Sequence, residues 1–149
     1  MRRIIEENTI GLVATVTPDG FPRVSPKGTM RVLGETRIGF ADLRSPETVR
    51  NIAANPSVEV SFIDVFRRQG CRLRGTARYH ARPSDGYREL APQFDTWRAL
   101  MERARGIVTV DVSEARLRRS PIYDIGAHEA DLVRQWLATY TRLHGDGRT

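Results

Sequence analysis

Alternating apolar and polar positions run through most of the chain and predict β-strands. In the segment 57–65, Val58, Val60 and Phe62 alternate with polar residues, which is the period of a strand with one buried face. Similar alternation predicts strands at residues 71–81 and 106–112, a continuous β-branched run predicts one at residues 10–17, and the segments between the turns that follow predict strands at residues 22–26, 30–33 and 37–43. Tight turns join most of these strands, and parallel pairing would instead need a helix after nearly every strand. The sequence therefore predicts a mainly β fold, an antiparallel barrel or sandwich of six or seven strands.

Three segments carry helical patterns. The first begins at residues 45–47 (Ser-Pro-Glu), which provide an N-cap residue, a proline at the first helical position and a carboxylate in the first turn, and it ends at residues 55–56 (Asn-Pro). Apolar residues recur at helical spacing in residues 84–104, which Pro92 is expected to divide into two pieces. They recur again in residues 128–143. We therefore expect three peripheral helices, the last of them a C-terminal amphipathic helix.

The chain length bounds the organisation of the protein. At 149 residues it has the size of one typical domain, and we expect residues 1–149 to form a single domain. No apolar run approaches the ~18 residues that a membrane span needs, and the N-terminus lacks the pattern of a secretory signal. The lone cysteine, Cys71, cannot form an internal disulfide and is expected to be a small buried residue in a strand. These features predict a cytoplasmic protein.

The net charge of +6 is compatible with nucleic acid, an anionic surface or a phosphorylated ligand as partner. The arginines are scattered, and their densest pairs, at residues 2–3, 67–68 and 118–119, lie on no recognisable recognition helix. We therefore expect a solvated, arginine-rich surface without a nucleic-acid or membrane partner. A basic nucleic-acid-binding barrel stays open as an alternative.

Several kinds of catalytic site have no support in the sequence. The three histidines, His80, His128 and His144, have no cysteine or carboxylate at metal-ligand spacing, so no metal site is expected. No nucleophile-elbow or phosphate-loop motif is present either. Hydrolase chemistry is therefore not predicted.

One part of the pattern indicates an anion site. The predicted strand 37–43 runs directly into the helix that begins after Ser45, and the first turn of a helix presents unpaired N–H groups and a positive dipole. Thr48 adds a hydroxyl to this turn, and Arg44 and Arg50 flank it with positive charge. Together they suit a phosphate, although a helix that is simply well capped would have the same pattern.

Lys27, in the segment 24–29 (Val-Ser-Pro-Lys-Gly-Thr), is the only lysine in the chain, whereas the other 23 of its 24 basic residues are arginine. An ammonium on a flexible stem is a mobile point charge with three donors, which suits a phosphate or a flavin carbonyl. The alternative is an exposed lysine on a hairpin.

The order of these motifs resembles the pyridoxamine 5′-phosphate oxidase-like family of FMN-binding split β-barrels. The resemblance covers roughly residues 1–120 and is greatest to the small FMN-binding proteins and flavin reductases of that superfamily. It rests on the sequence of a hairpin, a strand with a lysine, a helix that ends in Asn-Pro and a strand that contains Leu-Arg-Gly. The matching segments are residues 11–29, 37–62, 71–80 and 106–117. The resemblance implies a split-barrel homodimer with FMN at its interface.

The resemblance also assigns positions to the cofactor. These are Val24, Ser25, Pro26 and Lys27 against the isoalloxazine ring; Phe40, Ala41, Ser45 and Thr48 at the phosphate, with Arg44 or Arg50 as cation; and Arg72, Arg74 and Trp97 from the other subunit. Pyridoxamine phosphate oxidases proper have Ser-Arg-Lys at the helix start, whereas this chain has Ser-Pro-Glu, and their Arg-Leu-rich substrate motif is absent from its C-terminus. Vitamin oxidase activity is therefore not expected.

The expected function is that of an FMN-binding flavoprotein with a redox role on a small molecule or in electron transfer. A deazaflavin-dependent reductase and a flavin-binding or sensing module without turnover are the alternatives. Haem is the weaker option within the family because no histidine is placed as an axial ligand.

Overall fold

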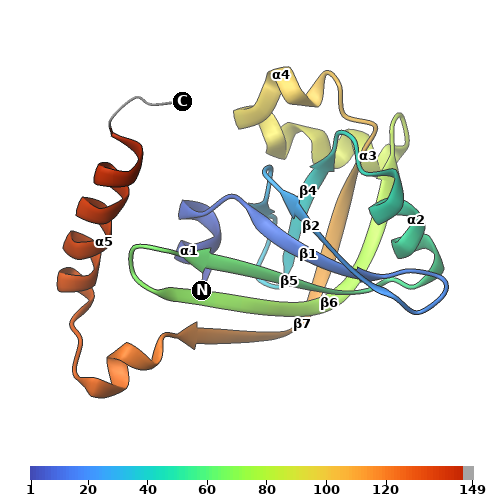
Figure 1. Ribbon diagram of the computed structural model, residues 1–149. Coiled ribbons are helices and arrows are strands. Elements are labelled where there is room, and N and C mark those ends of the chain that lie inside the picture. The colour runs from blue at the N-terminus through green and yellow to red at the C-terminus, as the bar shows by residue number, and fades with distance from the viewer. Residues whose placement is uncertain (146–149) are drawn as a thin grey trace.

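The computed structural model describes residues 1–145, and its main feature is a seven-stranded antiparallel sheet (Figure 1). The strands are β1 (Gly11–Val16), β2 (Pro22–Lys27), β3 (Arg31–Val32), β4 (Arg37–Asp42), β5 (Ser57–Asp64), β6 (Gln69–Ala81) and β7 (Gly106–Arg119). They are ordered β2-β1-β5-β6-β7-β4-β3, so β2 and β3 are the edges and the sheet is not closed. The predicted mainly β, antiparallel fold is confirmed.

Helices surround the sheet (Figure 1). They are α1 (Arg2–Glu7), α2 (Pro46–Ala54), α3 (Asp85–Leu90), the 3-10 helix η1 (Ala91–Trp97), α4 (Arg98–Met101), the 3-10 helix η2 (Pro121–Ile125) and α5 (Glu129–His144). The three predicted helical segments are confirmed as α2, the α3–η1–α4 group and α5. Pro92 lies at the start of η1, where it interrupts regular α-helix as expected. The short helices α1 and η2 were not predicted, because six and five residues are too few to show a helical period. None of the helices within residues 1–145 is long and apolar enough to cross a membrane.

The last strand is longer than its sequence pattern indicates. Residues 113–119 carry no apolar alternation and are largely exposed, yet they continue β7 by pairing with the first half of β6. Backbone hydrogen bonds therefore extend this strand without burial. A bulge between Arg74 and Gly75 breaks the register, and a side chain at Gly75 would collide with the carbonyl oxygen of Asp111.

The core consists of two clusters that share β4. Phe40 belongs to the larger cluster with Phe62 and Cys71, whereas Ala41 belongs to a second cluster between the sheet and the α3–η1–α4 group. Consecutive residues of a strand point to opposite faces, so β4 is buried on both sides. Its last residue, Asp42, is therefore firmly placed immediately before the turn into α2.

The C-terminal helix α5 is attached at one end of the sheet (Figure 1). Leu132 is buried, and the guanidinium of Arg68 lies 4.6 Å from the centre of the Trp136 ring. The rings of Phe66 and Tyr140 meet edge to face at 5.6 Å. These contacts bind α5 to the loop between β5 and β6, so the helix does not cover the cavity described next.

Candidate functional site

A cavity of about 500 Å³ lies between β2 and the start of α2. Figure 1 shows α2 beside the β1–β2 hairpin. The residues that line the cavity are Thr15, Arg23, Val24, Ser25, Lys27, Arg44, Ser45, Pro46, Glu47, Thr48 and Asn51. The volume is in the range of small-molecule sites. The structure thus brings together six residues that the sequence analysis had assigned to the cofactor from two separate segments, namely Val24, Ser25, Lys27, Arg44, Ser45 and Thr48.

Lys27 is buried, with 7% of its surface exposed, so the alternative of an exposed hairpin lysine is wrong. Its Nζ donates to Ser25 Oγ and to Ser45 Oγ, both at 2.7 Å, and lies 5.8 Å from the centre of the Phe40 ring. Burial lowers the pKa of this ammonium, and the negative charge of Asp42 opposes that shift. Lys27 therefore connects β2 to the residue that precedes α2.

The period of β2 explains why these side chains meet. Arg23, Ser25 and Lys27 alternate with Val24 and Pro26, so the three polar side chains share the face of the strand that is directed toward α2. Val24 is 64% exposed on the other side of β2, although it also borders the cavity.

The start of α2 is open toward the cavity. Ser45 is at the N-cap position as predicted, but its side chain makes no capping hydrogen bond, and its hydroxyl accepts from Lys27. Pro46 has no N–H group, and the amides of Glu47 and Thr48 belong to the first turn, where a helix provides no acceptor. Two backbone donors and the positive end of the helix dipole are therefore available to an anion.

Five lining residues were not assigned to the cofactor from the sequence: Pro46 and Glu47, predicted only as the start of the helix, and Thr15, Arg23 and Asn51, which were not predicted at all. Arg23 could have been found from its period-two spacing to Ser25 and Lys27 on a strand. Asn51 Nδ2 donates to Thr15 Oγ1 at 3.0 Å, and both side chains are buried. No sequence signal joins Thr15 to Asn51, because β1 and α2 meet only in the folded chain.

The other residues assigned from the sequence do not line this cavity. Phe40 and Ala41 are fully or almost fully buried in the two core clusters, and Arg50 is exposed on α2. Pro26 is also exposed, on β2. The three residues that were assigned to the site of the other subunit stay predictions. Of these, Arg72 and Arg74 lie on β6 beside Glu59, and Trp97 packs on Phe94.

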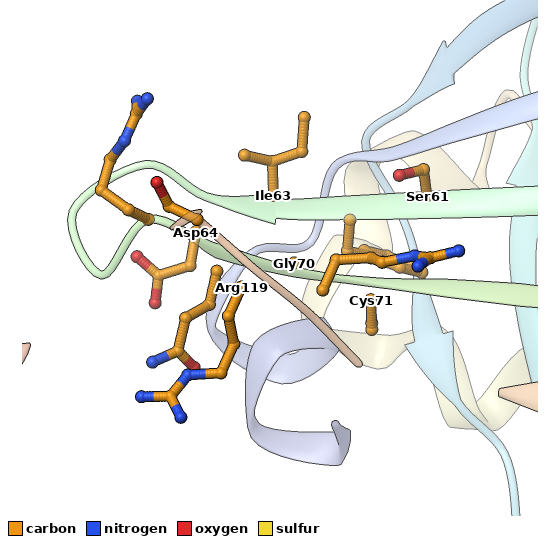
Figure 2. Close-up of a pocket in the computed structure, with 11 residues that line it drawn as sticks. Ser61, Ile63, Asp64, Gly70, Cys71 and Arg119 are labelled. Atoms are coloured by element: carbon orange, nitrogen blue, oxygen red, sulfur yellow. The ribbon is translucent and has the colours of Figure 1, made fainter. Parts of the chain in front are cut away.

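A second cavity, of about 400 Å³, lies at the far end of the β5–β6 hairpin (Figure 2). Figure 2 shows Ser61 and Ile63 on one side of the strands and Asp64, Cys71 and Arg119 on the other. Asp64 is engaged by Arg67, with 2.8 Å between its Oδ2 and an Nη. Burial of Asp64 alone would raise its carboxyl pKa, but hydrogen bonds from Arg67 outweigh that effect and hold the pKa below its usual value. None of the residues assigned to the cofactor lines this cavity.

Among the described residues, the lining of the first cavity contains one carboxylate, that of Glu47. None of the three histidines lines this cavity. His80 shares a hydrogen bond with Thr109 at 3.0 Å, and burial together with the charges of Arg78 and Arg37 lowers the pKa of its imidazole. Within residues 1–145, no three His, Cys, Asp or Glu side chains come together as ligands of a metal ion would.

Comparison with known proteins gives the chain a family. A family model described as pyridoxamine 5′-phosphate oxidase matches residues 1–136. A search of curated proteins found no match. The fold is similar to the solved structure of HupZ from Group A Streptococcus, with 27% identity, coverage of 77% of this chain and 88% of that one, and a TM-score of 0.67. It is similar to an F420 reductase, with 27% identity, coverage of 72% of this chain and 88% of that one, and a TM-score of 0.55. It is also similar to an FMN-binding protein from Syntrophomonas wolfei, with 12% identity, coverage of 78% of this chain and 82% of that one, and a TM-score of 0.65. Because the family match spans every strand and the whole first cavity, this chain belongs to the pyridoxamine 5′-phosphate oxidase family.

Proposed function

We propose that the protein binds FMN in the cavity between β2 and α2 and has a redox role on a small molecule or in electron transfer. The observation that carries the proposal is the placement of the buried Lys27 ammonium against the uncapped start of α2. Three basic side chains, Arg23, Lys27 and Arg44, line the cavity against one carboxylate, Glu47. An excess of positive charge beside free helix amides suits a phosphate dianion.

The donors of the cavity fit both parts of FMN. The Thr48 hydroxyl and the first-turn amides of α2 would hold the phosphate, with Arg23 or Arg44 as its cation. Within the described residues, the Lys27 ammonium donates to Ser25 and Ser45, which leaves the third of its N–H donors for a flavin carbonyl or a phosphate oxygen. When bound, the flavin would supply the hydride or electron chemistry, while these residues bind and orient it.

An absorption spectrum tests the cofactor. The purified protein, reconstituted with FMN, is expected to show a flavin band and saturable binding at micromolar concentration, because the site offers charge and donors to the phosphate. Titration with F420, a deazaflavin, and with haemin provides the comparison. A clear preference for F420 would replace FMN by the deazaflavin alternative, which the likeness to an F420 reductase supports. No binding of either flavin would refute the proposal.

Reduction of the bound flavin then separates an enzyme from a carrier. Fast bleaching of the flavin band by a reduced nicotinamide would support a reductase, since hydride transfer is the half-reaction that such enzymes share. Bleaching by dithionite or light alone would favour the electron-transfer or sensing alternative.

We also propose that the protein is a homodimer through the sheet face formed by β1, β2 and β5. Leu12, Val24 and Ile63 lie on this face and are 36%, 64% and 54% exposed, although all three are apolar. Strand register places Arg72 and Arg74 on the same face, which agrees with their assignment to the site of the other subunit. Exposed apolar side chains gathered on one face are typical of an interface.

The mass in solution tests the dimer. Light scattering at micromolar concentration is expected to give twice the chain mass, and Leu12→Glu is expected to shift it toward the monomer because a charge would be buried in the interface. Ile125→Glu is the control, since Ile125 is 84% exposed on η2, which is not one of the three strands of this face. A parent protein that binds FMN as a monomer would contradict the shared site.

A further inference from the structure

Asp42 is a buried carboxylate directly behind the cavity. Only 3% of its surface is exposed, and it is the last residue of β4. Its Oδ1 accepts from the amide of Ser45 at 2.9 Å, and its Oδ2 accepts from the hydroxyl of Tyr79 at 3.3 Å. Within residues 1–145, no basic side chain forms an ion pair with Asp42. A buried carboxylate without a direct ion pair is costly, so its presence calls for a compensating role.

The surrounding structure fixes the position of Asp42. The residues before it on β4, Phe40 and Ala41, are locked in the two core clusters. The carbonyl oxygen of Asp42 accepts from the amide of Arg105 at 2.8 Å, which ties this end of β4 to the chain that leads into β7. Asp42 can therefore act as a fixed reference point for the turn that follows.

Two hydrogen bonds join Asp42 to Lys27 through one residue. The amide of Ser45 donates to Asp42, and the hydroxyl of Ser45 accepts from Lys27 at 2.7 Å. The carboxylate thus determines where Ser45 sits, and Ser45 determines where the ammonium sits. We propose that Asp42 is a positioning residue of the cavity, which fixes Ser45 at the start of α2 and, through Ser45, fixes the Lys27 ammonium near its own negative charge.

The balance of charges around Lys27 supports this role. Arg23 from β2 and Arg44 and Glu47 from the start of α2 line the same cavity, and Tyr79 from β6 reaches the region through Asp42. Burial lowers the pKa of Lys27, and Asp42 is the charge that opposes the shift. Removal of the Asp42 charge should therefore lower the pKa of Lys27 further, so that the ammonium loses its proton at a lower pH.

The single lysine makes this measurable without any cofactor. Because the chain has one lysine, a protein labelled with ¹³C- and ¹⁵N-lysine gives a single side-chain NMR signal, whose pH titration reports the pKa of Lys27 directly. In Asp42→Asn we expect that pKa to fall relative to the parent, because the nearby opposite charge that opposes the effect of burial is lost. Glu47→Gln is the matched control on the cavity wall, and Asp111→Asn is the control on the surface. Both should move the Lys27 pKa much less.

An unchanged Lys27 pKa in folded Asp42→Asn would overturn the proposal. Asp42→Ser is the second charge-removing variant, since its hydroxyl can still accept from the Ser45 amide. Circular dichroism shows which variants fold, and failure of both to fold would assign Asp42 a purely structural role and reject the proposal.

The positioning role of Asp42 rests on the proposed function only because the cavity that it shapes is the proposed FMN site. The two proposals can therefore fail separately. The NMR titration needs no FMN, and a lowered Lys27 pKa in a protein that binds no flavin would refute the cofactor and leave the positioning role of Asp42 intact. If both proposals hold, FMN affinity should decline as the pH rises. This decline should begin at a lower pH in Asp42→Asn than in the parent. In Lys27→Ala this decline should be absent.

Discussion

Lys27→Ala is expected to weaken FMN binding about ten- to a hundredfold while leaving the protein folded. A hydrogen bond to a charged group is worth roughly 1.5 to 3 kcal/mol, which corresponds to that range of affinity. FMN affinity is expected to fall because the variant removes the buried ammonium that joins β2 to Ser45. Titration of the reconstituted protein, followed by flavin fluorescence, measures the effect. The fold is checked by the thermal unfolding curve.

Lys27→Arg should restore only part of the affinity. The guanidinium is planar and larger and presents its donors as a fixed fork, whereas Ser25 and Ser45 converge on a compact ammonium. Arg37→Lys is the control: Arg37 is about half exposed on β4 and pairs with Asp111 at 2.6 Å, away from the cavity. If Lys27→Ala binds FMN as tightly as the parent, the cavity is not the flavin site in the way proposed.

Phe40→Ala is expected to lower the free energy of unfolding by roughly 3 to 5 kcal/mol, the usual cost of deleting a fully buried aromatic ring. Phe40 has no exposed surface and belongs to the larger core cluster. Its ring also lies 5.8 Å from the Lys27 ammonium, so the variant removes support beneath the cavity. Chemical denaturation of the flavin-free protein measures this change.

The comparison with Phe40→Leu separates the structural role from a direct role at the flavin. Leucine keeps most of the buried volume, so this variant should lose much less stability and keep most of its FMN affinity. A stable Phe40→Leu variant that no longer binds FMN would instead place the ring at the cofactor, as the family resemblance implies.

Strands were the part of the fold most readily predicted from the sequence. Alternation over residues 57–65 is visible locally, because one face of a strand is buried and the other is not. The end of β7 was not predicted, since residues 113–119 are held by pairing with β6 and bury little. Pairing between distant segments leaves no periodic signal in either of them.

Candidate chemistry was predicted where single residues stood out. The lone lysine and the Ser-Pro-Glu start of α2 each indicated an anion site, and the structure places them 2.7 Å apart through the Ser45 hydroxyl. Ser45 was predicted as the N-cap residue and, by resemblance, as a phosphate contact, whereas in the structure its hydroxyl accepts from Lys27 and makes no capping hydrogen bond. Lys27 and Ser45 are 18 positions apart in the chain, so their contact forms only when β2 and the start of α2 come together.

The sequence by itself determined the antiparallel β fold, the start of α2 and the residue types that suit a phosphate. These follow from local periodicity and local backbone chemistry, which neighbouring residues are sufficient to specify. The tertiary structure alone decided that Lys27 is buried, that Asp42 lies behind Ser45, and that Thr15 contacts Asn51 at the cavity wall. Each of these contacts joins elements that are separate in the chain or depends on packing around them. Burial and electrostatic balance arise from the assembled core, so they were fixed only when β2, β4 and α2 came together.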